Sequence, residues 1–279
     1  MQPLRKTIGA ARPVRAETSA LVISNLSVRF GARTILDAIN FAVREGEFLC
    51  IVGSSGSGKT TLLRVLAGLA RPTEGKVLFS GAEISGPSRD RAIIFQDYSK
   101  ALLPWRTVRG NVALSLEARN VPSDEQDAII DDLLARMGLT GTKQQFPGQI
   151  SGGMQQRVQI ARCLAQNPKL LLMDEPFGAL DAMTRQTLQD DILQLVSEKQ
   201  IATVFITHDL EEAIYLGDRV IVLGGSPAGI RESIEIDLPR PRNQLTTRED
   251  SRFLAYRHRL FEMLVHERSS QASQIKGQS

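Results

Sequence analysis

The chain has 279 residues, of which 42% are hydrophobic and 23% are charged, the balance of a globular protein with one large or two modest domains. The longest charge-free run, residues 144–156, is polar, whereas a membrane-spanning helix needs about 20 apolar residues, so we expect no membrane span. Two cysteines, Cys50 and Cys163, cannot form a disulfide framework, which favours a reducing compartment.

The positive charge is concentrated at the two ends of the sequence. The net charge is +3 and the isoelectric point is near 9.0, which would suggest nucleic-acid binding. Residues 1–20 carry +3 and residues 239–279 carry +4, which leaves −4 for residues 21–238, so we expect no nucleic-acid partner. Residues 1–20 lack the apolar segment of a secretory signal and are predicted to be a disordered basic leader, with an Arg-rich transit segment as the alternative.

Hydrophobic periodicity predicts strands that alternate with helices. The predicted strands cover residues 21–30, 34–43, 48–52, 76–79, 92–95, 170–173, 203–206 and 219–223. The predicted helices cover residues 60–70, 185–197, 210–217 and 252–265, and residues 107–165 are mostly helical with breaks near Gly141 and Pro147. This alternation predicts an α/β fold with a largely parallel sheet, into which an all-helical subdomain of about residues 100–165 is inserted.

A glycine-rich loop follows the apolar run 48–52 and precedes a helical pattern. It fits the phosphate-binding pattern G-x4-G-K-[ST] and consists of Gly53, Ser54, Ser55, Gly56, Ser57, Gly58, Lys59 and Thr60, with Thr61 adjoining it. Glycines let successive N–H groups point at phosphate oxygens, and the following helix adds its N-terminal dipole. Lys59 is expected to reach the β- and γ-phosphates and Thr60 to ligate Mg²⁺. The alternative, a flexible Gly/Ser loop, does not explain the strand and helix on either side.

Two further motifs carry groups that suit nucleotide chemistry. The apolar run 170–173 ends in Asp174, a position for an Mg²⁺ ligand, and in Glu175, a candidate general base for water attack on the γ-phosphate. An acidic turn after a strand is common, but the upstream phosphate loop favours the functional interpretation. Ser151, Gly152 and Gly153 begin a helical pattern and form a second candidate anion site, with a plain helix cap by Ser151 as the alternative.

Together these motifs resemble the ATP-binding-cassette (ABC) ATPases, in order, over about residues 21–238. Gln96 is similar to the glutamine of the family's Q-loop, Asp181 to the aspartate of its D-loop and His208 to the histidine of its H-loop. The resemblance implies a P-loop NTPase-type core with an antiparallel β subdomain and the helical subdomain. It also implies an ATPase domain at 21–242 and a C-terminal helical tail at 243–279.

The resemblance further implies a head-to-tail homodimer that binds ATP and Mg²⁺. Each ATP would lie between the phosphate loop of one copy and Ser151–Gly153 of the other, and Asp181 would cross the interface. Glu175, His208 and Gln96 would be catalytic, while Thr60, Asp174 and Gln96 would hold the metal. Phe30 occupies the adenine-stacking position, with a core aromatic as the alternative.

Met154 and the run Leu102-Leu103-Pro104-Trp105 resemble the nitrate, sulfonate and taurine importer branch of the family. This branch implies an ATP-hydrolysing subunit, peripheral on the cytoplasmic face of the inner membrane. It would drive uptake of an aliphatic sulfonate, taurine or nitrate through two separate permease subunits served by an extracytoplasmic binding protein. Trp105 would anchor a permease helix, unless it is a core aromatic. Arg106 and Gly110 depart from the branch pattern at this docking region.

Two other functions use the same motifs. A cassette for DNA repair carries a long coiled coil, yet only 54 residues separate Gln96 from Ser151, and ribosome-associated types usually contain two cassettes. An ATP-sensing regulator without turnover would not need Glu175. The importer subunit is therefore the favoured interpretation.

Overall fold

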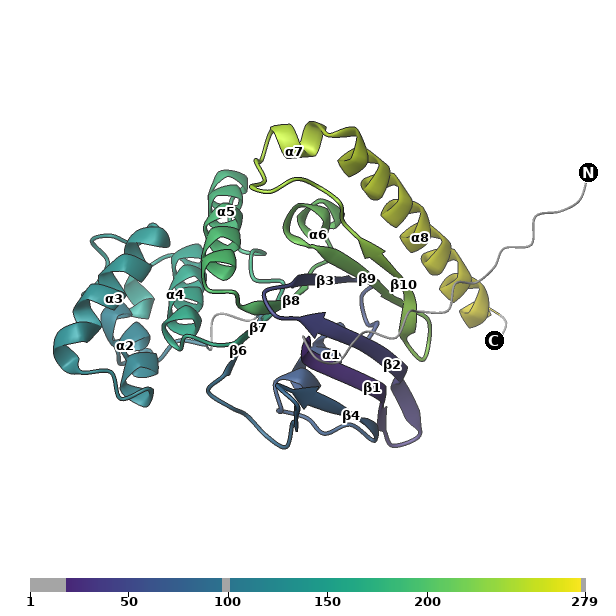
Figure 1. The fold of residues 1–279 in the computed structure, drawn as a ribbon, viewed down its shortest axis with the longest axis horizontal. Helices are drawn as coiled ribbons and strands as arrows, with labels where there is room; N and C mark the ends of the chain where they lie inside the picture. Colours follow the sequence, from purple (N-terminus) through teal and green to yellow (C-terminus); the bar gives the residue numbers. More distant parts are fainter. Residues whose placement is uncertain (1–18, 97–100, 277–279) are drawn as a thin grey trace, which may run out of the picture.

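The computed structural model describes residues 19–96 and 101–276, with side chains as far as residue 266 (Figure 1). The expected disordered leader lies outside these ranges except for its last two residues, and for those the prediction is wrong. Ser19 and Ala20 already belong to the first strand, where Ser19 pairs with Arg44.

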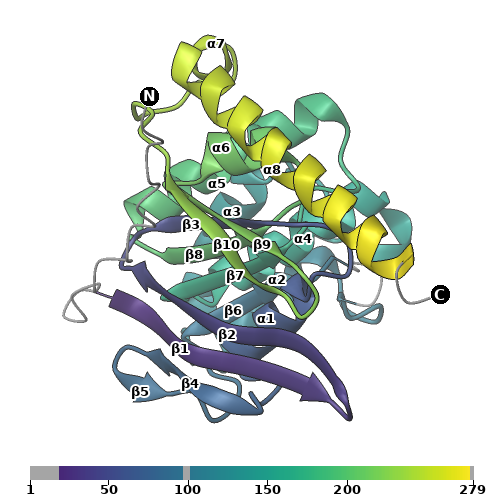
Figure 2. The same ribbon diagram turned by 90° about the vertical axis from the view of Figure 1, so that its right-hand side faces the viewer.

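Two sheets form the body of the molecule, as Figure 2 shows. The six-stranded sheet has the order β10-β9-β3-β8-β7-β6, and the four-stranded sheet has the order β2-β1-β4-β5. The strands of the larger sheet are β3 (Phe48–Val52), β6 (Arg91–Ile94), β7 (Leu170–Asp174), β8 (Ala202–Ile206), β9 (Arg219–Gly224) and β10 (Gly229–Glu235). Those of the smaller sheet are β1 (Ser19–Phe30), β2 (Arg33–Arg44), β4 (Glu74–Phe79) and β5 (Ala82–Glu83). All pairs of the larger sheet are parallel except β9 with β10, and the smaller sheet is antiparallel, which confirms the predicted fold class.

The helices separate into a lateral group and a group that covers the larger sheet (Figure 1). The lateral group is α2 (Val108–Ala118), α3 (Ser123–Arg136) and α4 (Gly152–Ala165). The others are α1 (Lys59–Leu66), α5 (Ala182–Glu198), α6 (Leu210–Leu216), α7 (Thr246–Glu249) and α8 (Ser251–Lys276). Among residues 19–96 and 101–276, no helix combines the length and apolar character that crossing a membrane requires.

The larger sheet is buried on both faces, which explains why its inner strands consist mostly of apolar residues. Phe48, Cys50 and Val52 point to the core under the helices, while Leu49 and Ile51 point to the core between the two sheets. Both cysteines lie in the first of these cores as free, buried thiols.

Two helices end or begin at other residues than the sequence predicts, because a single residue sets the backbone conformation there. The helix predicted over 60–70 ends at Leu66, because Gly68 adopts a left-handed conformation with φ of 78° and its N–H bonds to the carbonyl of Val65. The helix predicted from 185 begins at Ala182, because Asp181 Oδ1 accepts a hydrogen bond from the N–H of Thr184 at 3.0 Å and caps it. Strand β10 was not predicted at all.

The parallel register brings four loops to one edge of the larger sheet. Strands β3, β8, β7 and β6 are successive neighbours in it, and all four run in the same direction. The segments that follow them are therefore adjacent in space, and the crevice beyond the carboxyl ends of parallel strands is where such folds bind ligands. These segments begin at Gly53, Thr207, Glu175 and Phe95.

A buried ion pair joins the two sheets. Glu47 Oε1 accepts a hydrogen bond from Arg219 Nε at 2.7 Å, and the Glu47 side chain is only 2% exposed. Arg219 begins β9 in the larger sheet and also donates to the carbonyl of Ala42 in β2 of the smaller sheet. The position of β2 relative to the larger sheet thus depends on this contact.

Replacing Glu47 with alanine is expected to lower the free energy of unfolding by about 3 kcal/mol, because Arg219 loses its buried carboxylate partner and keeps only the exposed Glu235 at 3.7 Å. Urea unfolding of both proteins measures the difference. The matched control is Glu74→Ala, which removes an exposed pair with Arg29 at 3.0 Å and should cost less than about 1 kcal/mol. Equal losses in the two variants would contradict the role of Glu47.

Candidate functional site

The loop between β3 and α1 is curled so tightly that two of its glycines have no room for a side chain. A Cβ at Gly53 would lie 2.2 Å from the carbonyl oxygen of Leu223. Gly58 has a φ of 78°, and a Cβ there would lie 2.7 Å from the Leu36 side chain. These residues fix the loop against β9 and β2, and the loop lines one cavity at the start of α1.

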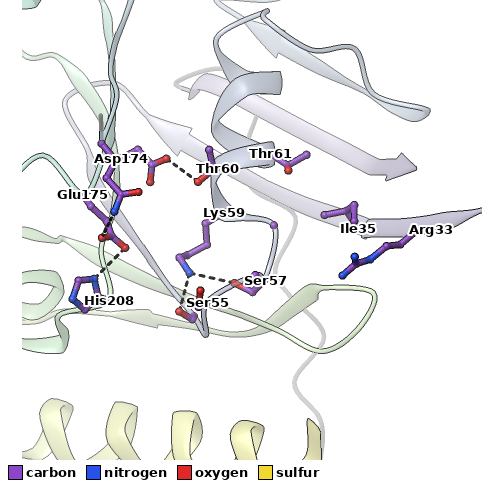
Figure 3. Close-up of a pocket in the computed structure, with 14 residues that line it drawn as sticks. Arg33, Ile35, Ser55, Ser57, Lys59, Thr60, Thr61, Asp174, Glu175 and His208 are labelled. Atoms are coloured by element: carbon purple, nitrogen blue, oxygen red, sulfur yellow. Dashed lines mark hydrogen bonds and ion pairs between the residues drawn. The ribbon is translucent and has the colours of Figure 1, made fainter. Parts of the chain in front are cut away.

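Lys59 is held by this loop, as Figure 3 shows. Its Nζ donates hydrogen bonds to the carbonyls of Gly53 at 2.9 Å and Ser54 at 2.8 Å. Burial lowers the pKa of Lys59, while the nearby carboxylates of Glu175 and Asp174 raise it. The loop therefore presents a positioned cation beside two carboxylates, which suits an anionic ligand that arrives with a counter-cation.

Thr60 and Asp174 meet across the cavity from neighbouring elements. Thr60 Oγ1 donates to Asp174 Oδ2 at 2.8 Å, and Asp174 is only 4% exposed. Burial raises the pKa of the Asp174 carboxyl, although the hydrogen bond from Thr60 acts in the opposite direction.

The donor set fits Mg²⁺, which binds oxygen ligands and keeps several waters or phosphate oxygens of its own. Thr60 and Asp174 offer two oxygens side by side. Within the described ranges, no group of three or more His, Cys, Asp or Glu side chains forms a complete protein-only metal cage.

The side chains of Gln96 and His208 both contact the carboxylate of Glu175, and all three residues were expected to be catalytic. Figure 3 shows His208 beside Glu175. Gln96 Nε2 donates to Glu175 Oε2 at 3.1 Å, and His208 Nδ1 lies 3.0 Å from Glu175 Oε1. The backbone of Glu175 is left-handed, with φ of 46°, and its N–H donates to the carbonyl of Ile206 at 2.9 Å. A non-glycine residue in this region is strained, and such strain is found at functional sites.

These groups line one open cavity of about 540 Å³. Its lining residues are Arg33, Ile35, Gly53, Ser55, Gly56, Ser57, Gly58, Lys59, Thr60, Thr61, Gln96, Asp174, Glu175 and His208. Sequence reasoning missed Arg33 and Ile35, which come from β2. Their only signal was the predicted strand beside Phe30, the residue that pairs with Arg33 across the hairpin.

Other expected site residues lie outside this cavity. Ser151 Oγ accepts a hydrogen bond from the N–H of Met154 at 3.3 Å and caps α4, so Ser151, Gly152 and Gly153 form a helix start elsewhere on the surface. Asp181 likewise caps α5 and does not line the cavity. Phe30 and Trp105 are 62% and 71% exposed, so the alternative that either is a core aromatic is wrong.

Comparison with known proteins identifies the family. The sequence pattern of the ABC transporter family matches residues 36–178, just over half of the chain. The chain belongs to the ABC transporter family. It is an ATP-binding cassette and an ATPase, as its motifs implied.

Two relatives match almost the whole chain. The bicarbonate transport ATP-binding protein CmpD of Synechocystis sp. is 42% identical over 276 residues, which cover 95% of this chain and 97% of CmpD. The nitrate transport protein NasD of Klebsiella oxytoca is 43% identical over 249 residues, which cover 88% of this chain and 93% of NasD.

A solved structure shares the architecture. The solved structure is that of another ABC cassette, MJ0796, as a dimer in a post-hydrolysis state bound to ADP and Pi. It superimposes with a TM-score of 0.70 at 30% identity and covers 77% of this chain and 98% of its own.

Replacing Lys59 with alanine should raise the dissociation constant for ATP by about 10- to 100-fold, because one charge-assisted contact with phosphate is lost. Titration calorimetry with ATP measures the change. Lys76→Ala, at an exposed lysine of β4, is the control and should bind ATP like the wild type. Unchanged affinity in the Lys59 variant would refute the assignment of the phosphate site.

Proposed function

We propose that this ATPase powers the import of a small inorganic anion, nitrate or bicarbonate, through separate permease subunits. The observation that carries the proposal is the end-to-end match to CmpD and NasD, whose names specify bicarbonate and nitrate transport. Nitrate was among the anions expected from the sequence, and bicarbonate was not. Sulfonates and taurine stay predictions.

In this proposal the phosphate loop binds the ATP phosphates. The N–H groups around Ser55 and Gly56 and the start of α1 offer hydrogen bonds and a positive dipole end to the anion. Lys59 exchanges its loop carbonyl contacts for the terminal phosphates. Arg33 and Ile35 bound the cavity on the β2 side, and Phe30 next to them offers its exposed ring to adenine.

The carboxylate of Glu175 is placed to orient the attacking water and accept its proton. A general base must lie within hydrogen-bond reach of the proton that it takes, and Glu175 lines the same cavity as Lys59. His208 and Gln96, each about 3 Å from one Glu175 oxygen, fix the orientation of the carboxylate. When ATP binds, these two side chains are positioned to contact the γ-phosphate and the water.

Thr60 and Asp174 would hold Mg²⁺, with Gln96 as a further ligand. When bound with ATP, the cation supplies positive charge that offsets the charge of the phosphates. Without it, the same residues keep Asp174 in place through the 2.8 Å hydrogen bond from Thr60.

The active unit is proposed to be a head-to-tail dimer of this chain. Ser151 and the N–H groups that begin α4 form an anion-binding helix start, yet they do not line the cavity of their own chain. A second copy turned head-to-tail would bring this helix start, and Asp181 at the start of α5, to the open side of the cavity. The dimeric state of the similar solved cassette supports this arrangement.

The permease docking site is proposed at Trp105. Trp105 is 71% exposed at the start of the helical subdomain, nine residues after Gln96 in the sequence. An exposed aromatic of this size is a strong anchor for a partner helix. Arg106, which pairs with Glu117 at 3.0 Å, borders the anchor. The chain would thus lie as a peripheral subunit on the cytoplasmic face of the inner membrane, with an extracytoplasmic binding protein delivering the anion.

Replacing Glu175 with glutamine is expected to abolish steady-state ATP hydrolysis while ATP binding is retained, because the amide cannot accept the proton of the water. Phosphate release and size-exclusion chromatography with ATP measure the two effects, and a stable dimer should accumulate. Steady-state hydrolysis at the wild-type rate would contradict the assignment of the base.

The transported anion is tested in a strain that lacks this gene. Growth should fail either with limiting nitrate as sole nitrogen source or with limiting inorganic carbon, and the wild-type gene should restore it. The Glu175→Gln gene should not restore growth, because import needs hydrolysis. Normal growth of the deletion strain under both limitations would overturn the proposed substrates.

A further inference from the structure

The segment of residues 240–257, here named the C-terminal arm, crosses the short helix α6. It comprises the loop before α7, α7 itself and the first two turns of α8, and Figure 1 shows it passing over α6. Helix α6 begins at Leu210, two residues after His208. The position of His208 is therefore coupled to the position of α6.

A network of buried hydrogen bonds connects the backbone around His208 to the interior of the protein. Thr207 Oγ1 donates to Glu212 Oε2 at 2.7 Å and accepts the N–H of Asp209 at 3.0 Å, so it fixes the backbone on both sides of His208. Glu212 is 7% exposed, and its Oε1 accepts a hydrogen bond from Gln189 Nε2 at 3.1 Å. Burial raises the pKa of Glu212, while the hydrogen bond from Thr207 and the nearby charge of Arg185 at 4.0 Å lower it.

The C-terminal arm adds to this hydrogen-bond network through Gln244. Gln244 Nε2 donates to Asp190 Oδ1 at 2.8 Å and to the carbonyl of Gln186 at 3.1 Å, and lies 3.4 Å from Gln189 Oε1. Gln189 is 1% exposed, so its amide has little freedom once Gln244 is in place. The arm thereby fixes the group that donates to Glu212.

The arm also holds both ends of α6. Near its start, Arg248 Nη1 and Arg257 Nη1 bind the two carboxylate oxygens of Glu211 at 2.7 and 3.0 Å. At its end, Arg242 Nη1 donates to the carbonyl of Ile214 at 3.0 Å and Arg240 Nη2 to that of Leu216 at 3.2 Å, where the helix leaves carbonyls unsatisfied.

A seven-residue helix is too short to be stable by itself, so its position depends on such tertiary contacts. The His208 side chain is 74% exposed and has Glu175 as its described ion-pair partner. The ATP side of the site thus constrains His208 weakly, and most of the constraint comes through α6.

We propose that the C-terminal arm positions His208 for ATP hydrolysis, with Glu212 as the positioning residue that transmits its contacts. A partner or ligand that lifted the arm would then slow hydrolysis while the phosphate loop stayed intact. This inference rests on the proposed role of His208.

The test compares steady-state hydrolysis of ATP by the full-length chain and its variants. Glu212→Gln and the double variant Gln244→Ala/Arg248→Ala should each lower kcat by about 10-fold, because a small misplacement of a reacting group is costly. The KM and the dissociation constant for ATP should stay within about twofold, because neither variant touches the phosphate loop. Circular dichroism melting shows that the variants are folded at the assay temperature.

The matched control is Arg252→Ala, an arginine of the same arm whose partners are Asp250 at 2.8 Å and Asp237, not α6. It should keep the wild-type kcat. The decisive measurement repeats the two test variants in a His208→Ala background, where a positioning role predicts no further loss.

The outcomes separate the two proposals. An unchanged kcat in His208→Ala alone would overturn the role of His208 and, with it, this inference. A reduced kcat in His208→Ala together with a wild-type kcat in both test variants would overturn only the role of the arm. Losses that add fully to that of His208→Ala, or that appear equally in Arg252→Ala, would also overturn it.

Discussion

The parallel pairing of β3 with β8 and of β8 with β7 is the constraint on which the rest of the structure depends. Three short, fully buried strands of mostly apolar residues pair side by side, and the functional residues lie at or just after their carboxyl ends. The phosphate loop, His208 and the pair Asp174 and Glu175 meet because these strands end at one edge of the sheet. No local preference of the loops could bring them together, since more than a hundred residues separate Lys59 from Asp174 in the chain. Burial of both sheet faces therefore fixes the geometry of the cavity at this edge.

Much of this site was predictable because its residues follow local patterns. An apolar run followed by a glycine-rich loop, or by paired carboxylates, specifies both the element and the chemistry. Gln96 and His208 were assigned through the resemblance to the family, and the structure places each of them about 3 Å from an oxygen of the Glu175 carboxylate. Sequence did not specify that Glu175 would be left-handed, because that conformation is imposed by the hydrogen bond to Ile206 from the neighbouring strand.

The features that could not be predicted come from long-range packing. Arg33 and Ile35 line the cavity only because the second sheet folds over the first, which depends on the pair of Glu47 and Arg219. Strand β10 lies at a sheet edge with exposed charged residues, so its pattern is weak. An aromatic residue such as Trp105 suits a core or an anchor equally well on composition, and only the fold shows that it is exposed. The contacts of the C-terminal arm with α6 are also long-range, and no local sequence pattern indicated them.

Both cysteines of the chain are free and deeply buried. Burial raises the pKa of the Cys163 thiol to about 11 and that of Cys50 well above its ordinary value, so neither forms the reactive thiolate at neutral pH. The native protein is therefore expected to react very slowly with thiol reagents. A cysteine introduced at an exposed position away from the proposed docking and nucleotide sites, such as 76, would react alone, so a fluorophore or spin label could follow conformational changes of the chain without prior removal of the natural cysteines.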